Sequence, residues 1–373
     1  MPDSREPRTI ESRIAGQVRV VGVGLLGTSI GLGLRARGVD VILADASPTN
    51  LSIAVDYGAG REAAPADSVT PDNPALIVVC VPPDVTAQIV AAELDAYPDA
   101  LVTDVASVKL APLVELRASG ADVSRYLGSH PLAGRERGGP LSGRADLFLG
   151  RPWVVADHGG VSYQRGAILD DLILDLGATL VEMTPEEHDA SVALVSHVPQ
   201  VVSSVMARRL TDAPEAAVGL AGQGLRDVTR IAASDPELWV QILGANAAPV
   251  AGVLREFRDD LDRFIEALEN PATGSSRRRI NEELAGGNAG VARIPGKHGL
   301  DRRYSSIVVM VDDRPGELAR LFLEIGEAGV NLEDLRLEHS PGAQIGLAEI
   351  SVLPEVVQRL TDELSQRGWR IAG

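Results

Sequence analysis

Short apolar runs alternate with helix-compatible stretches through the first half of the chain. Each run is long enough for one buried strand, and the runs cover residues 18–23, 39–44, 75–81, 101–105, 151–156 and 178–183. An amphipathic stretch at about 163–176 separates the last two runs. Strands that alternate with helices form a parallel, doubly wound sheet, whose ligands bind at the carboxyl ends of the strands. The pattern therefore predicts an α/β domain over residues 15–184.

The spacing of apolar residues becomes helical after Thr184. From residue 186 to about 268, apolar side chains recur at helical intervals and no strand-like run interrupts them. This predicts an all-helical domain over 185–270, whose apolar faces pack against the first domain or a second subunit. Residues 271–304 contain an arginine triplet and two adjacent glycines, a composition that predicts a linker. Its positive charge fits either a solvated connection or an anion-responsive hinge.

The last part of the chain, residues 305–373, has the pattern of a separate small domain. Strands are predicted at 306–311, 332–337, 345–353 and 369–372, and helices at 315–328 and 355–366. Pro315 lies in the first turn of the first helix and Gly329 follows its end, an asymmetry common at helix termini. The order βαββαβ predicts a ferredoxin-like sandwich.

Composition and charge exclude several classes of function. The 373 residues suffice for two or three domains, and 45% are hydrophobic, so a large core can form. The net charge of −17 argues against a nucleic-acid or membrane partner, because phosphate binding requires a basic surface. The single cysteine, Cys80, lies in an apolar run, so we expect a buried structural thiol. We expect neither a signal peptide nor a membrane-spanning run, so the sequence predicts a soluble, cytoplasmic protein.

The first strand–helix junction contains a Rossmann-like dinucleotide-binding pattern. Of its glycines, Gly22 permits a tight turn, Gly24 lets the backbone approach a pyrophosphate, and Gly27 allows helix and strand to pack closely. Asp45, at the end of the next strand, can accept hydrogen bonds from ribose hydroxyls and would repel a 2′-phosphate. No Arg or Lys follows in residues 46–49, so NAD is predicted rather than NADP. The predicted cofactor-binding residues are Gly22, Gly24, Leu25, Leu26, Gly27, Asp45, Val81 and Pro82.

Candidate reactive side chains follow two predicted strands and recur in the helical region. The segments 103–109 and 129–138 lie where this class of fold places its ligand cleft. His130 is the leading candidate base, because the pKa of histidine lies near neutral pH and its Ser, Pro and Gly neighbours indicate a loop. His197 by itself fits a core histidine as well as a ligand. Arg230 could clamp a carboxylate through two hydrogen bonds or form a surface ion pair.

Several longer motifs occur in a distinctive order along the chain. They are GVGLLGTSIGLGLR, DVASVK, SHPLAGRERGG with ADLFLGRPWVV, HDASVALVSHVPQ, and GLRDVTRIAASDPELW. Together they resemble the prephenate/arogenate dehydrogenase family, the TyrA enzymes of the tyrosine pathway, over nearly the whole chain. The C-terminal unit, with DRPGEL at 313–318 and GVNL at 329–332, resembles an ACT domain, a small amino-acid-sensing module.

The resemblance implies an NAD-linked oxidative decarboxylation of prephenate to 4-hydroxyphenylpyruvate in tyrosine biosynthesis. Hydride would leave the ring carbon that bears the hydroxyl, and loss of CO₂ would make the ring aromatic. By motif match, His130 would take up the hydroxyl proton, and Ser107 would hydrogen-bond the same hydroxyl or orient His130. The implied substrate-binding residues are His197 and Arg230, with Glu136 and Asp227 tuning Arg230 or gating the pocket and Trp239 shaping its wall. No metal is implied.

The family also implies a homodimer formed through the helical domain, with substrate bound between that domain and the nucleotide domain. In the ACT-like unit, Gly316 would permit close approach of a ligand, and Asn331 could bind an amino-acid backbone. Tyrosine is therefore the expected feedback effector. A module that only supports oligomerisation fits the same sequence.

Single features separate this interpretation from other functions. A β-hydroxyacid dehydrogenase has similar domains but typically depends on a catalytic lysine in the helical domain, and residues 186–268 contain none. A catalytically silent sensor of NAD and an amino acid would not need the full set of candidate reactive residues, which are Ser107, His130, His197 and Arg230. Arogenate, which carries an amino group where prephenate has a keto group, remains an alternative substrate.

Overall fold

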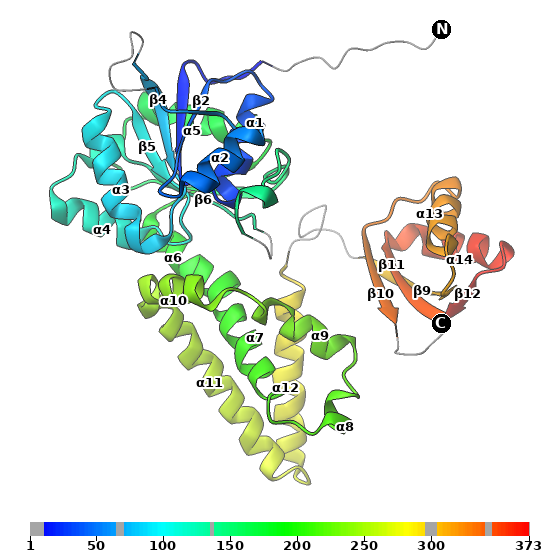
Figure 1. Ribbon diagram of the computed structural model, residues 1–373. Coiled ribbons are helices and arrows are strands. Elements are labelled where there is room, and N and C mark those ends of the chain that lie inside the picture. Colours follow the sequence, from blue (N-terminus) through cyan, green and yellow to red (C-terminus); the bar gives the residue numbers. More distant parts are fainter. Residues whose placement is uncertain (1–10, 65–70, 135–137, 295–303, 340–344, 373) are drawn as a thin grey trace, which may run out of the picture. The chain divides into compact units, whose positions relative to one another are not determined.

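The computed structural model describes residues 11–64, 71–134, 138–294, 304–339 and 345–372, and Figure 1 labels their helices and strands. The chain divides into two compact units. The first comprises Met1–Arg209 and Thr229–Glu256, and the second comprises Leu210–Val228 and Phe257–Gly373. The helices predicted as one separate domain are therefore shared between the two units.

A five-stranded parallel sheet forms the centre of the first unit, in the order β3-β2-β1-β4-β5. Its strands are β1 (Gln17–Val21), β2 (Val41–Ala44), β3 (Arg61–Glu62), β4 (Pro74–Val79) and β5 (Leu101–Asp104). The helices that connect them are α1 (Leu25–Arg35), α2 (Pro48–Asp56), α3 (Pro83–Ala96) and α4 (Leu110–Ser119). Figure 1 shows α1 and α2 on one side of the sheet and α3 and α4 on the other. The predicted doubly wound arrangement is confirmed, and the strand order reverses beside β1, where such folds bind ligands.

Two apolar cores bury the two faces of this sheet. One core joins strand residues such as Val18 and Val20 to residues of α1, α2 and α5 (Tyr163–Asp175). The other joins Ile77 and Val79 to residues of α3 and α4. Because both faces are covered, the central strands are almost entirely apolar, which is why their positions were predictable from the sequence.

A second, three-stranded sheet corrects the prediction of one parallel sheet. It consists of β6 (Gly128–Pro131), β7 (Pro152–Ala156) and β8 (Thr179–Met183), in the order β6-β7-β8. β6 runs antiparallel to β7, whereas β7 and β8 are parallel. The short elements η1 (Val123–Arg125) and η2 (Pro140–Ser142) flank β6 on either side.

The same strand corrects the expectation that His130 lies in a loop. His130 pairs with Val154 in the antiparallel ladder between β6 and β7. The hydroxyl of Thr103 donates to Ser129 Oγ at 3.0 Å, and Ser129 Oγ donates to the carbonyl oxygen of Asp104 at 3.0 Å. These bonds hold β6 at the carboxyl end of β5, although its Gly, Ser and Pro residues have low strand propensity.

A nearly continuous helical segment begins at Thr184, whose side chain forms a reciprocal capping box with Glu187. The segment consists of α6 (Pro185–Val192), the π-helical turn η3 (Ala193–His197) and α7 (Val198–Arg208). By length and composition alone, Pro185–Arg208 is apolar enough to cross a membrane, contrary to the expectation from the sequence. The interior helix of a globular domain passes the same test, and this one buries His188, Asp189 and His197.

The remaining helical elements are α8 (Glu215–Val218), α9 (Gln223–Thr229), η4 (Arg230–Ala232), α10 (Pro236–Ala245), α11 (Ala247–Glu269) and α12 (Gly274–Val291). Helix α12 shows that the predicted linker over 271–304 is wrong for most of its length. Thr273 caps the helix by accepting a hydrogen bond from the Ser276 N–H, and Arg279 pairs with Glu266 of α11. The capping bond and the ion pairs support a helix despite its interior glycines.

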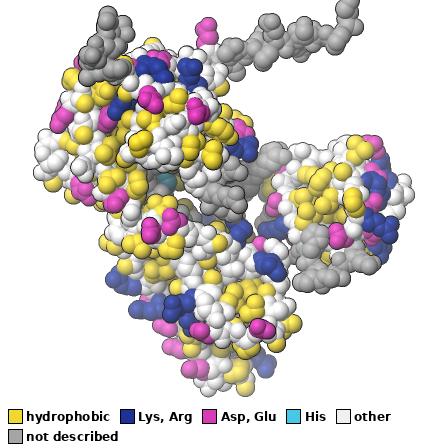
Figure 2. All heavy atoms as spheres, viewed as in Figure 1, with side chains coloured by type: hydrophobic (Ala, Val, Ile, Leu, Met, Phe, Trp, Pro, Cys, Tyr) yellow, Lys and Arg dark blue, Asp and Glu magenta, His cyan; other side chains and the backbone are white. Residues whose placement is uncertain are grey.

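Apolar side chains remain on the surface of the helices, as Figure 2 shows. On α11, Phe257, Leu261, Ile265 and Leu268 are all more than two-fifths exposed and follow one another at helical spacing. Exposed apolar stripes of this kind usually contact a partner. They agree with the prediction that this region packs against a second subunit.

The C-terminal part of the second unit has the predicted order βαββαβ. Its elements are β9 (Ser305–Asp312), α13 (Glu317–Glu327), β10 (Asp334–His339), β11 (Ile345–Val352), η5 (Pro354–Val356), α14 (Val357–Gln366) and β12 (Arg370–Ala372). The strands form an antiparallel sheet in the order β10-β11-β9-β12, with a core that includes Val309, Leu321 and Leu360. The predicted ferredoxin-like arrangement of this small domain is therefore confirmed.

Candidate active site

The glycine-rich turn between β1 and α1 has the geometry of a dinucleotide cradle. Gly22 has a φ of +94°, and a Cβ there would lie 2.4 Å from the carbonyl oxygen of Cys80. A Cβ on Gly27 would lie 1.9 Å from the carbonyl oxygen of Gly22. In contrast, a Cβ on Gly24 would meet no other described atom within 4 Å. The backbone at Gly24 is thus open to a ligand, as close approach of a pyrophosphate requires.

The neighbouring residues complete a site that fits NAD. Gly24 provides no side-chain cap for α1, so the N–H groups of Leu25 and Leu26 at its first turn can bind phosphate. The carboxylate of Asp45 accepts hydrogen bonds from Val23 N–H and Ser47 N–H, both at 2.7 Å. Each of its oxygens retains a lone pair for a ribose hydroxyl.

The loop after β4 forms the other side of the glycine turn. Val81 Cγ1 would lie 3.1 Å from a Cβ on Gly22, and Pro82 precedes α3. Cys80 lies directly after β4 rather than within it, which corrects the expectation of a strand residue. Desolvation, followed by the charge of Asp104, raises the pKa of its thiol, so Cys80 stays protonated.

Two alanine substitutions should separate the roles of these glycines. Gly24→Ala should leave the fold intact and weaken NAD binding at least tenfold, because its methyl group enters the space open to the pyrophosphate. Gly27→Ala should destabilise the protein by about 1–3 kcal/mol or more, because its methyl group overlaps Gly22. Fluorescence titration with NADH measures the affinity of Gly24→Ala, and thermal unfolding measures the stability of both variants. Unchanged NADH affinity in Gly24→Ala would contradict this assignment.

His130 is linked by hydrogen bonds to a second histidine and a carboxylate. His130 Nδ1 lies 2.9 Å from His188 Nε2, and His188 Nδ1 lies 2.7 Å from Asp189 Oδ1. The backbone N–H groups of Lys109 and Leu110 donate to the same carboxylate at 2.8 and 3.0 Å. Strand β6 and helix α6, far apart in the sequence, therefore meet in one polar network.

A buried ion pair lies next to this network. Lys109 Nζ pairs with Asp104 Oδ1, and both side chains are fully buried. Tyr126 donates its hydroxyl to Asp104 Oδ2 at 2.6 Å, and the Ala106 N–H donates to Asp104 Oδ1 at 2.9 Å. Burial lowers the pKa of Lys109, while the charge of Asp104 opposes that shift. The pair anchors the end of β5 to the start of α4.

His197 lies at the end of the π-helical turn and is 1% exposed. Asn246 donates from Nδ2 to the carbonyl oxygen of Asp189 at 2.8 Å and to His197 Nδ1 at 3.0 Å. His197 Nδ1 is therefore an acceptor, and its Nε2 carries the proton. Trp239 packs edge-on against the His197 ring, with the ring centroids 5.9 Å apart. Burial lowers the pKa of His197 to about 4, so it is a neutral hydrogen-bond donor at physiological pH.

The other predicted site residues have less defined surroundings. Ser107 is half-buried in the loop between β5 and α4, and Arg230 is exposed at the start of η4. Asp227 accepts a hydrogen bond from Gln223 at 2.7 Å. Glu136 lies outside the described residues. The roles expected for these four residues stay predictions.

Sequence reasoning missed several members of the polar network, namely Asp104, Lys109, Tyr126, His188, Asp189 and Asn246. Two sequence motifs contained four of these residues and could have pointed to them. Asp104 and Lys109 belong to the DVASVK motif, and adjacent His188 and Asp189 begin HDASVALVSHVPQ. No sequence signal marked Tyr126 or Asn246. Among the described residues, no group of three or more His, Cys, Asp or Glu side chains is arranged to hold a metal ion.

Comparisons with protein families and known proteins agree with one another. The nucleotide-binding domain of prephenate dehydrogenase matches residues 30–182, and the dimerization domain of the same family matches residues 184–282. The Streptomyces niveus protein "Probable prephenate dehydrogenase NovF" is 37% identical over 94% of this chain and 98% of its own length.

Two solved structures are also similar to this chain. Prephenate dehydrogenase from A. aeolicus, in complex with hydroxyphenyl propionate and NAD⁺, is 26% identical, with a TM-score of 0.66 over 75% of this chain and 99% of the other. Arogenate dehydrogenase from Synechocystis is 25% identical, with a TM-score of 0.61 over 74% of this chain and 99% of the other. With the dinucleotide cradle and the histidine network, these findings confirm the predicted NAD cofactor and family. The chain belongs to the prephenate dehydrogenase family of NAD-dependent oxidoreductases.

Proposed function

We propose that this protein converts prephenate and NAD⁺ to 4-hydroxyphenylpyruvate, CO₂ and NADH, as a step of tyrosine biosynthesis. The observation that carries the proposal is the position of His130 in an NAD-binding fold. The hydrogen bonds of the adjacent Ser129 hold its strand at the carboxyl end of β5, and His188 bonds its ring. The relative named "Probable prephenate dehydrogenase NovF", 37% identical over 94% of this chain, supports it further.

In this reaction the protein orients the substrate and moves one proton. When held by the glycine turn and Asp45, NAD would supply the acceptor for the hydride that leaves the ring carbon bearing the hydroxyl. His130 accepts the hydroxyl proton as the C–H bond breaks, and the phenol regains a proton after CO₂ has left. The proton on His197 Nε2 can be donated to a substrate oxygen, and Ser107 hydrogen-bonds the ring hydroxyl. Arg230 binds a substrate carboxylate, and Trp239 shapes the wall of the pocket.

The direct test is NADH formation, followed at 340 nm, with purified protein and either prephenate or arogenate. We expect the higher kcat/KM with prephenate and with NAD rather than NADP. Arogenate is the second candidate, because the similar Synechocystis structure is an arogenate dehydrogenase. A higher kcat/KM with arogenate would replace prephenate as the substrate. No turnover with either compound would favour a catalytically silent sensor.

The pH dependence of this reaction should reflect the burial of His130. Burial lowers the pKa of His130 well below 6.5, and the nearby His188, Lys109 and His197 lower it further. The neutral base therefore predominates at pH 6.5, and activity should fall only under more acidic conditions. We expect the acidic limb of kcat/KM to lie below pH 6.5 in rates measured from pH 5 to 9. A limb at or above pH 6.5 would contradict this prediction.

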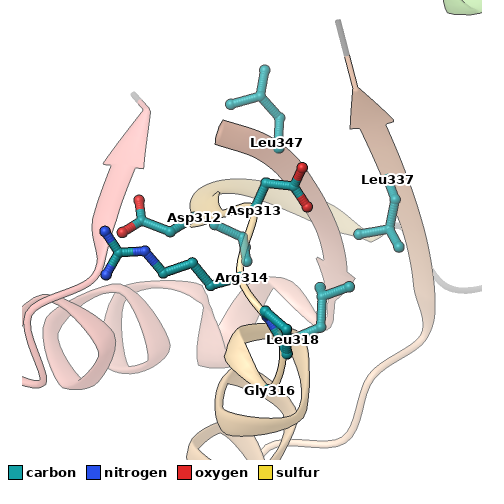
Figure 3. Close-up of a pocket in the computed structure, with 10 residues that line it drawn as sticks. Asp312, Asp313, Arg314, Gly316, Leu318, Leu337 and Leu347 are labelled. Carbon is teal, nitrogen blue, oxygen red and sulfur yellow. The ribbon is translucent and has the colours of Figure 1, made fainter. Parts of the chain in front are cut away.

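We further propose that the C-terminal domain is an ACT domain that binds tyrosine as a feedback inhibitor. Figure 3 shows its pocket, a cavity of about 410 Å³ beside the turn between β9 and α13. Asp313 and Arg314 offer charges for an ammonium and a carboxylate, while Leu318 and Leu347 offer apolar surface for a ring. Gly316 lines the pocket, whereas the proposed effector residue Asn331 is not among its lining residues.

The proposed effector site can be tested with two matched glycine variants at the ends of α13. Gly316 and Gly329 both have positive φ, +93° and +68°, so alanine at either position adds similar strain of roughly 1–2 kcal/mol. Only Gly316 lines the pocket. We expect tyrosine to inhibit the wild type and Gly329→Ala, but to inhibit Gly316→Ala at least tenfold less. Rates with and without tyrosine measure this, and equal inhibition of both variants would contradict it.

We also propose that the working form is a homodimer. The dimerization-domain match over 184–282 and the exposed apolar stripe on α11 support it. Sedimentation equilibrium should give about twice the 39.2 kDa mass of one chain.

A further inference from the structure

We propose that His188 and Asp189 are positioning residues that fix the tautomer of His130, so that Nε2 of His130 presents its lone pair to the substrate hydroxyl. This inference rests on the proposed function, in which His130 is the base. His188 and Asp189 need not touch the substrate. They would act through the hydrogen bonds that join them to His130.

The orientation of Asp189 is fixed at one end of this chain of hydrogen bonds. Its carboxylate accepts from the backbone N–H groups of Lys109 and Leu110 and from the His188 ring. Burial alone would raise the pKa of Asp189, but these hydrogen bonds outweigh it and lower the pKa. Asp189 is therefore an anion that only accepts hydrogen bonds.

An acceptor at Asp189 determines the proton positions on both histidines. His188 must carry its proton on Nδ1 to donate to Asp189, and burial lowers the pKa of His188, which keeps it neutral. Its Nε2 is then an acceptor, so His130 must donate from Nδ1 across the 2.9 Å contact. A neutral His130 with a proton on Nδ1 has its lone pair on Nε2. Each assignment follows from the one before it.

The same arrangement supports the proton transfer itself. As the substrate O–H bond breaks, a bond forms between that proton and His130 Nε2, and Nδ1–H continues to donate to His188. The imidazolium therefore keeps an acceptor, and Asp189 compensates part of its positive charge through His188. The charge of Lys109, which also faces His130, opposes the charge of this imidazolium, whereas His197 is neutral at physiological pH. In serine proteases, a buried aspartate fixes the tautomer of the catalytic histidine in a comparable way.

Packing keeps this geometry in place. His188 is fully buried and Asp189 is 3% exposed. The rings of His130 and His188 meet edge-on, with centroids 5.1 Å apart. A side chain of similar size without an acceptor can therefore replace His188 and remove only the hydrogen bonds.

Two substitutions of His188 test the proposal. His188→Gln can place an amide oxygen near the position of Nε2 and still accept from His130, whereas His188→Phe fills the space without an acceptor. We expect His188→Phe to lower kcat roughly 10²-fold with KM for prephenate within twofold, and His188→Gln to recover at least tenfold of that loss. Thermal unfolding and NADH titration establish that each variant is folded. His158→Gln serves as the control and should keep wild-type kcat, because the hydrogen bond of His158, to the Tyr126 carbonyl oxygen at 2.9 Å, does not involve His130, His188 or Asp189.

A spectroscopic measurement reports the tautomer directly. The chain has six histidines, so ¹⁵N-histidine labelling gives few signals, and that of His130 is the one lost in His130→Gln. We expect a protonated Nδ1 and an unprotonated Nε2 in the wild type, and a mixture of tautomers in His188→Phe.

The outcomes separate this inference from the proposed function. Wild-type turnover in His130→Gln would reject His130 as the base. An inactive His130→Gln with near wild-type kcat in His188→Phe would reject only the positioning role. Equal losses in the Phe and Gln variants, or a proton found on His130 Nε2, would also reject it.

Discussion

Replacing His130 with asparagine should lower kcat by about 10²- to 10⁴-fold, the usual contribution of a general base. Asparagine places an amide N–H near the position of Nδ1, so the hydrogen bond to His188 can persist while the Nε2 base is lost. Strand β6 should tolerate the change, because the pairing of residue 130 with Val154 involves only backbone groups. The loss should therefore be confined to the chemical step.

Single-turnover rates of NADH formation, together with NADH binding, check this prediction. The variant should bind NADH with wild-type affinity, since the cofactor cradle is formed by other residues. Turnover within threefold of the wild type would show that the ring hydroxyl loses its proton to another group. Loss of NADH binding would show that the substitution has disturbed the fold.

Replacing Lys109 with methionine should destabilise the protein by about 3–5 kcal/mol, the cost of breaking a buried ion pair. Lys109 and Asp104 are both fully buried. Methionine preserves most of the volume of lysine but leaves the Asp104 carboxylate without its counter-charge. Two donors, Tyr126 and the Ala106 N–H, remain and limit the loss.

Urea unfolding followed by circular dichroism measures this effect. The double variant Asp104→Asn with Lys109→Met should recover much of the lost stability, because neither charge is then buried. Arg144→Met provides the contrast, since the Arg144–Asp146 pair is exposed on both sides and should contribute little. A Lys109→Met variant as stable as Arg144→Met would contradict the prediction.

Local patterns account for the parts of the structure that the sequence predicted well. The parallel strands were recognisable because burial on both faces makes each a short apolar run. Gly22, Gly24, Gly27 and Asp45 were recognisable because a dinucleotide imposes fixed conformations and spacings on one turn. The βαββαβ order was predictable because apolar residues recur at a different interval in strands than in helices.

The errors arose where local composition and long-range contacts disagree. β6 has a loop-like composition, and hydroxyl bonds to β5 and pairing with β7 make it a strand. Helix α12 contains the paired glycines of a linker, and its cap and its ion pairs with α11 offset their cost. In both cases a tertiary contact outweighs a propensity of about 1 kcal/mol or less per residue.

The sequence by itself determined the class of fold, the NAD cradle, the family and the choice of His130 as the leading base. Each depends on residues close together in the chain or on motifs in a recognisable order. Only the tertiary structure decided which partners fix the proton positions on His130 and His197. His130 and His188 are 58 residues apart, and Lys109 and Asp189 are 80 apart, so no local spacing reveals those bonds.

Even His188 and His197, nine residues apart, would point to opposite sides of a regular α-helix, about 180° apart. The π-helical turn between them changes the angle between the two side chains about the helix axis. Asn246 then bonds both the carbonyl oxygen of Asp189 and the ring of His197. A π turn depends on the packing around it rather than on a residue pattern, and for that reason the histidine network could be found only in the folded protein.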